Sequence, residues 1–211
     1  GPSMILGVIN DARATHRRLY RSEGGGVFNL VAQHPAATNT VTDNVYSASL
    51  GAPCNSESFN HPPSNLQGLT MIGNGFLAGF FENTLCFCEP YYPHAWPIDY
   101  QYAFHDDIVG ISVVGGAVIV TTTGNPWVVM GGHPSAMSQV RLDLRASNLS
   151  RAGLVDMGSY ALYPSSEGLV MASASDVQVI SSEIISRSQW LDLDPASFKA
   201  FRYRGQYLCF G

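Results

Sequence analysis

The residue types best suited to chemistry gather in one stretch of the sequence, where Glu89, His94, His105, Asp106 and Asp107 follow one another closely. Carboxylates near a histidine can transfer protons or hold a metal ion. The same residues also have structural uses, because paired aspartates cap turns and a histidine ring packs against other rings. We favour the structural interpretation. The alternative is a hydrolase that uses Glu89 together with Asp106 or Asp107.

Other signs of catalysis or metal binding are weak in this sequence. It contains no nucleophile elbow, no His-Glu-x-x-His motif, no phosphate loop and no dinucleotide fingerprint. Cys86 and Cys88 are two apart in an expected strand and point to one face, so they are badly placed to bond each other. With Cys54 and Cys209 they do not form the paired spacing of a zinc site. We therefore expect four buried, unbridged thiols in a reducing compartment, and no metal or cofactor.

The elements that position these residues follow a repeat. A glycine, four mostly apolar residues and a second glycine recur about every 43 residues, a length typical of β-propeller blades. A turn and a second apolar run follow each copy. The motifs occupy 68–73, 110–115 and 153–158, and the turns 82–83, 124–125 and 167–168. We expect an all-β fold with propeller-like repeats, hairpins at 69–88, 111–130, 154–172 and 198–210, and none of these glycines in a helix.

The remaining segments divide the chain into parts. Residues 1–15 are interpreted as a tag scar and a frayed start. Strand-like runs and a glycine-rich turn at 16–49 predict a small β lobe. Proline, serine and asparagine are frequent at 50–67, so we expect a linker there, followed by the blade repeats at 68–211.

Composition limits the classes of partner. Charged residues make up 13% of the 211 residues, about half of the usual 25%, which suits a β-rich protein and a subunit within an assembly. The net charge of −5 gives no electrostatic footprint for nucleic acid. No run is as long and apolar as a membrane span, and no signal peptide opens the sequence.

The run from Glu89-Pro90 to Trp96-Pro97, together with several shorter motifs, resembles tailed-bacteriophage and prophage structural proteins. The strands at 18–43 also resemble half of a fibronectin type III domain in those proteins. The most specific part of the resemblance is the run from Glu89-Pro90 to Trp96-Pro97. Further motifs are Leu66-Gln67-Gly68-Leu69, 74–80, 83–91, Val109-Gly110-Ile111, Thr123-Gly124-Asn125-Pro126-Trp127, 155–158 and 168–170.

The resemblance implies a tail tubular or nozzle-type component of a short-tailed phage, of which this chain is expected to be a fragment. Such a protein acts without catalysis, is made in the bacterial host cytoplasm and ends in the virion. It associates with copies of itself and with other tail proteins. We expect contacts through Tyr91, Tyr92, His94 and Trp96, since tyrosine and tryptophan are favoured interface anchors. We also expect self-association through the last hairpin, because its fourth repeat leaves an apolar edge unpaired.

The alternative function is a carbohydrate- or host-receptor-binding propeller module. In that case the aromatic side chains of the same loop would be stacking platforms for a ligand. The two functions differ in one simple observation, which is whether the purified protein binds glycans.

Overall fold

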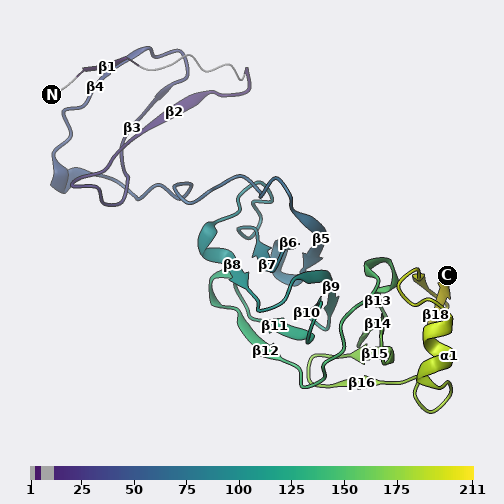
Figure 1. Ribbon diagram of the computed structural model, residues 1–211. Helices are drawn as coiled ribbons and strands as arrows, with labels where there is room; N and C mark the ends of the chain where they lie inside the picture. Colours follow the sequence, from purple (N-terminus) through teal and green to yellow (C-terminus); the bar gives the residue numbers. More distant parts are fainter. Residues whose placement is uncertain (1–2, 6–11) are drawn as a thin grey trace. The chain divides into compact units, whose positions relative to one another are not determined.

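The computed structural model describes residues 3–5 and 12–211 and divides into two compact units, 1–58 and 59–211 (Figure 1). The boundary falls inside the predicted linker at 50–67. Ser3–Ile5 forms strand β1, which pairs with β4 (Thr40–Thr42), so this part of the expected frayed start is a strand. The tag scar and frayed start were predicted for residues 1–15, and of these residues 1–2 and 6–11 lie outside the described residues.

The smaller unit is built on one antiparallel hairpin. Strand β2 (His16–Arg21) pairs with β3 (Asn29–Pro35), and the turn between them contains Gly24 and Gly25, both at positive φ. The beginning of the predicted linker belongs to this unit, since the Leu30 amide donates to the Ala52 carbonyl at 2.9 Å. A short 3-10 helix, η1 (Ser47–Ser49), precedes that segment.

The larger unit contains three four-stranded antiparallel sheets and a terminal hairpin. Within every sheet the strands are neighbours in chain order, so the expected all-β fold is confirmed. The first sheet is β5 (Gln67–Ile72), β6 (Phe76–Phe81), β7 (Thr84–Phe87) and β8 (Gln101–Ala103); the second is β9 (Ile108–Val114), β10 (Ala117–Thr122), β11 (Trp127–Met130) and β12 (Ser138–Arg141); the third is β13 (Val155–Asp156), β14 (Ala161–Ser165), β15 (Gly168–Ala172) and β16 (Val177–Val179); the hairpin is β17 (Lys199–Tyr203) and β18 (Gln206–Phe210).

The glycine motifs have similar places in the three sheets. Gly73, Gly115 and Gly158 all lie between the first and second strands of their sheets. The prediction that no motif glycine is helical is wrong for Gly73 and Gly153, which lie in the 3-10 helices η2 (Gly73–Gly75) and η5 (Arg151–Gly153). Single 3-10 turns of this kind are frequent connectors. The predicted turns at 82–83 and 124–125 separate the second and third strands, as does Glu167 of the turn predicted at 167–168, whereas Gly168 is the first residue of β15. Each predicted hairpin at 69–88, 111–130 and 154–172 therefore extends over three strands.

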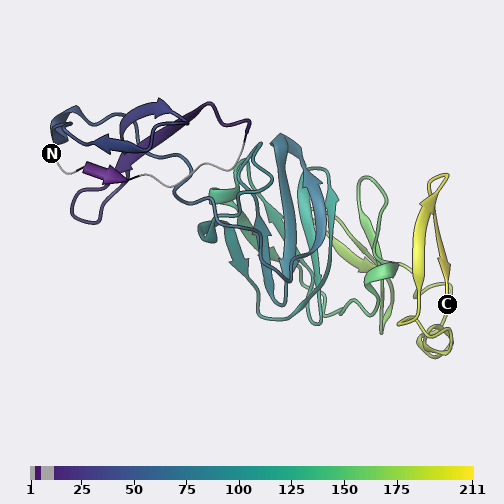
Figure 2. The ribbon, with the colours of Figure 1, turned by 90° about the horizontal axis from the view of Figure 1, so that it is seen from above.

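The sheets and the terminal hairpin follow one another in a row (Figure 2). Three apolar clusters lie between successive members of this row. The first cluster joins residues of the first sheet to Val118 and Val120, and the second joins Ile119 to Tyr163 of the third sheet. The third cluster lies between the third sheet and the hairpin. Strand β10 is buried at every position, which explains why its sequence shows no alternation of apolar and polar residues.

The first strands of the sheets lie next to one another. Strand β5 contacts β9, β9 contacts β13, and β13 contacts β17. The one α-helix of the described residues, α1 (Arg187–Asp192), follows the third sheet and begins with a capping box formed by Ser186 and Gln189. Its Trp190 indole donates to the Ser165 carbonyl at 2.7 Å, which fixes the helix against the third sheet.

Replacement of Tyr163 by phenylalanine tests the cluster between the second and third sheets. The Tyr163 side chain is fully buried, and its hydroxyl donates to the Ala146 carbonyl at 3.0 Å. Loss of this bond leaves a buried carbonyl without its partner, so we expect Tyr163→Phe to lower the free energy of unfolding by about 1–3 kcal/mol. Chemical denaturation measures this value. The matched control Tyr203→Phe, at a half-exposed position, should change it by less than about 0.5 kcal/mol; equal effects would contradict the assignment.

Candidate functional site

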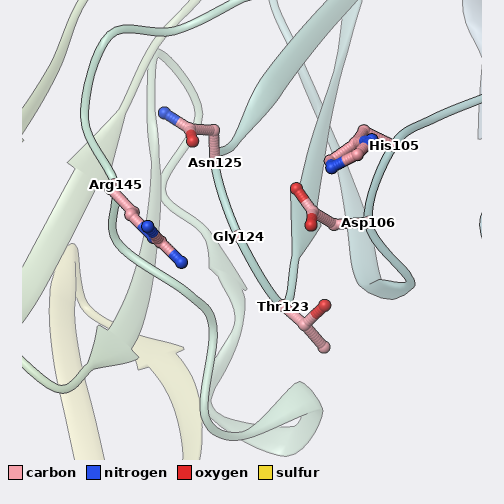
Figure 3. Close-up of a pocket in the computed structure, with 6 residues that line it drawn as sticks. All are labelled: His105, Asp106, Thr123, Gly124, Asn125 and Arg145. Atoms are coloured by element: carbon pink, nitrogen blue, oxygen red, sulfur yellow. The ribbon is translucent and has the colours of Figure 1, made fainter.

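A polar cavity of about 210 Å³ lies where loops of the larger unit meet (Figure 3). One wall comes from the loop after β8, a second from the turn between β10 and β11, and a third from the segment after β12. The cavity therefore brings a carboxylate, a guanidinium, an amide and an imidazole together. The lining residues are His105, Asp106, Thr123, Gly124, Asn125 and Arg145.

Hydrogen bonds between side chains and the backbone hold the central wall of this cavity in place. The Thr122 hydroxyl donates to the Asn125 carbonyl at 2.7 Å and accepts from the Gly124 amide at 3.0 Å. The Asn125 side chain donates to the Leu142 carbonyl at 3.2 Å, which links the turn to the segment after β12. A β-carbon at Gly124 would collide with the Asp106 carboxylate, so glycine at this position allows that carboxylate to lie against the turn.

The structure brings together only part of the predicted constellation. His105 and Asp106 line the cavity, whereas Asp107 contributes its backbone carbonyl, which accepts from the Thr123 amide at 2.9 Å. Glu89 does not line the cavity. Its carboxylate accepts a hydrogen bond from the Tyr100 hydroxyl at 2.8 Å. The pairing of Glu89 with Asp106 or Asp107 that the hydrolase alternative requires is therefore not found in this cavity.

Tyr100 keeps its proton in this arrangement. Burial, and then the hydrogen bond to the Glu89 carboxylate, raise the pKa of Tyr100 to about 12. The phenol is therefore neutral at physiological pH and donates to Glu89. This bond gives the Glu89 carboxylate a structural partner at the base of the aromatic loop.

Thr123 and Arg145 were not predicted as site residues, and Gly124 and Asn125 were predicted only as a turn. The repeat places residues 124–125 between two strands, but it carries no information on which other loops meet them. Arg145 lies in a segment without a sequence motif, and its position depends on the path of the chain between the second and third sheets.

The aromatic loop, residues 89–97, is a second candidate surface. Its backbone is held by hydrogen bonds from Glu89 to Ala95 and from Tyr91 to Gly75, both at 2.8 Å. Tyr91 has a φ of 65°, which is a strained conformation for a bulky residue. Its ring lies where a β-carbon at Gly75 would be, so Gly75 is required for this loop conformation.

Three of the four predicted contact residues lie at the surface. Tyr91, Tyr92 and His94 are exposed. The rings of Phe59, Tyr92 and His94 form a cluster with centroids 5.2–6.1 Å apart. Trp96 is only 2% exposed, and its indole donates to the Pro93 carbonyl at 3.0 Å. It belongs to the first core cluster, and its amide donates to the Asn60 carbonyl at 2.9 Å, so it is not available as a surface contact.

The cysteines are all free but differ in their surroundings. Cys86 and Cys88 are buried, whereas Cys54 is half-buried and Cys209 is exposed. The prediction of four buried thiols is therefore wrong for Cys54 and Cys209. Burial raises the pKa of the Cys86 thiol to about 12 and also raises the pKa of Cys88. Neither of these two thiols is an activated nucleophile.

Alkylation of the folded protein should separate the cysteines into two classes. Iodoacetamide at neutral pH is expected to modify Cys209 first and Cys54 next, because only accessible thiolates react. Cys86 and Cys88 should react at least about tenfold more slowly and become accessible only in denaturant. Peptide mass spectrometry over time measures each rate. Fast modification of Cys86 in the folded protein would contradict the buried position of β7.

Within residues 3–5 and 12–211, no three His, Cys, Asp or Glu side chains form a group that could hold a metal ion. The same part of the chain has no helix with the length and apolar character needed to cross a membrane. The chain matches no known protein-family model and no curated protein.

Proposed function

We propose that this chain is a structural component of a phage or prophage virion tail, in the tail tube, nozzle or adaptor, and that it acts by subunit assembly without catalysis. The observation that carries the proposal is the serial packing of four-stranded sheets, each apolar on the faces that meet its neighbours. We infer that these sheets are propeller blades. Adjacent first strands and chain-order meanders support this inference, since blades are arranged in this way around an axis.

The surface of the larger unit also favours an assembly role. Its aromatic loop presents Tyr91, Tyr92 and His94 on a backbone fixed by hydrogen bonds. Aromatic side chains that need little ordering are effective anchors in protein interfaces. The low share of charged residues, 13%, suits surfaces that become covered by neighbouring subunits.

Purified particles provide the test of this proposal. We expect the chain to band with phage or prophage particles in a density gradient and to be detected there in several copies by quantitative mass spectrometry. An antibody against residues 59–211 should label the tail in electron micrographs. Recovery of the chain only from the soluble lysate, and never from particles that carry other tail proteins, would overturn the proposal.

The ring cluster favours a second candidate, a carbohydrate- or host-receptor-binding propeller module. Phe59, Tyr92 and His94 form an accessible aromatic surface, and aromatic faces with a polar tip suit recognition of amphipathic ligands. A glycan array with the purified protein separates the two functions. For a purely structural protein we expect no binding above background.

Tyr92→Ala is the informative variant in that experiment, and Tyr46→Ala is its control, because Tyr46 is 83% exposed in the smaller unit. Reproducible glycan binding that Tyr92→Ala abolishes and Tyr46→Ala preserves would establish the binding module in place of the purely structural role.

A further inference from the structure

The stack of sheets ends on an exposed apolar surface at each side. The leading face consists of Leu69 and Met71 on β5, which are 61% and 65% exposed. The trailing face consists of Phe201, Tyr203 and Phe210 on the terminal hairpin, which are 47%, 50% and 61% exposed. Large apolar side chains that are grouped at the surface are typical of interaction sites.

The leading face occupies positions that form contacts between sheets elsewhere in the chain. In the repeat, Leu69 corresponds to Ile111 in the second sheet, and Met71 corresponds to Val113. Ile111 and Val113 pack into the cluster that joins their sheet to the sheet before it. Leu154, the matching residue of the third repeat, packs in the same way against the second sheet. Leu69 and Met71 therefore present the side chains with which a sheet meets its predecessor.

The trailing face corresponds to the surface with which a sheet meets the sheet that follows it. Ala200 and Tyr207 of the hairpin pack against the third sheet, and the Tyr207 hydroxyl donates to the Gly153 carbonyl at 2.8 Å. Side chains alternate along a strand, so Phe201 and Phe210 lie on the other face. Their rings are stacked, with centroids 5.8 Å apart and planes at 22°. The hairpin therefore half-buries Ala200 and Tyr207 on one face and exposes an aromatic surface on the other.

The charges of the two ends are complementary. Residues 59–103, which contain the first sheet, carry Glu82, Glu89 and Asp99 and have no lysine or arginine. Arg151 donates to the Gln67 side chain of β5 at 2.7 Å and adds one positive charge there, so this end stays net negative. Residues 198–211, which contain the hairpin, carry Lys199, Arg202 and Arg204 and have no acidic residue. Opposite charges attract the two ends, whereas two copies of either end repel each other. This asymmetry favours a contact between unlike ends.

We propose that the trailing face of one copy packs against the leading face of a second copy, so that the stack of sheets continues from chain to chain. The contact is heterologous, which generates a ring if the rotation closes and an open chain if it does not. The inference rests on the proposed assembly role for its biological meaning. Its test uses the purified full chain alone, so the tail assignment and this contact can fail separately.

Two double variants and a control test the contact by analytical ultracentrifugation. Phe201→Thr with Phe210→Thr alters the trailing face, and Leu69→Thr with Met71→Thr alters the leading face. Threonine keeps the preference for strands. Each variant should raise the dissociation constant of self-association by at least about tenfold. Val140→Thr, at a 49% exposed position on β12, should leave it unchanged. Higher salt should weaken association of the unaltered protein.

A mixture of the two double variants is the decisive measurement. The first variant retains its leading face and the second retains its trailing face, so one intact contact can form between them. We expect a 1:1 heterodimer from two variants that do not self-associate. Circular dichroism should show that both are folded; if the hairpin variant unfolds, loss of association in the leading-face variant still tests the contact.

Three outcomes would overturn the proposal. Undiminished self-association of the leading-face variant would show that two hairpins pair with each other. A monomeric unaltered protein would show that the trailing face does not bind a second copy. A monomeric mixture of the two variants would show that the two faces do not bind each other.

Discussion

The larger unit depends on apolar side chains that lie between successive sheets. A single sheet with two apolar faces has no stable form in water, because one or both faces stay exposed. Here β10 satisfies this constraint by contributing Val118 and Val120 to one cluster and Ile119 to the next. Each sheet therefore completes the core of its neighbours, and the surfaces left at the ends follow directly from the same constraint.

The polar groups of the unit are arranged around this stack. Polar atoms inside an apolar core must find partners, and the Thr121 hydroxyl does so by donating to the Gly110 carbonyl at 2.9 Å while it accepts from the Asn148 side chain at 3.0 Å. Loops at the margins of the sheets hold further polar side chains. Two features lie at such margins: the cavity lined by Asp106 and Arg145, and the aromatic loop. The rigid sheets position the side chains of these loops, although the core does not need them.

Local patterns predicted a large part of the fold. The spacing of the glycine motifs and turns indicated the repeat. The last hairpin was predicted at 198–210, close to the observed strands β17 and β18. Both predictions rest on patterns among residues that are neighbours in sequence. The break between β5 and β6 was missed although Gly73-Asn74-Gly75 interrupts the apolar run, because Gly73 was interpreted as the edge of a strand and the turn was placed at 82–83. Burial of Trp96 depends on a contact with Asn60, whose carbonyl accepts the Trp96 amide at 2.9 Å. Arg145 joins the cavity through loops of different sheets, and such long-range contacts leave no local pattern.

The order of the sheets along the chain has a consequence for synthesis on the ribosome. Each sheet of the larger unit is made of strands that are neighbours in sequence, so it can form as soon as its own residues leave the exit tunnel. At roughly 5–20 residues per second, a repeat of about 43 residues takes a few seconds to emerge. During that interval the newest sheet has covered the preceding one, but its own forward face still lacks a partner. The growing chain therefore passes through a series of states that each expose one apolar face, and the surface of Phe201 and Phe210 has the same character as these transient faces.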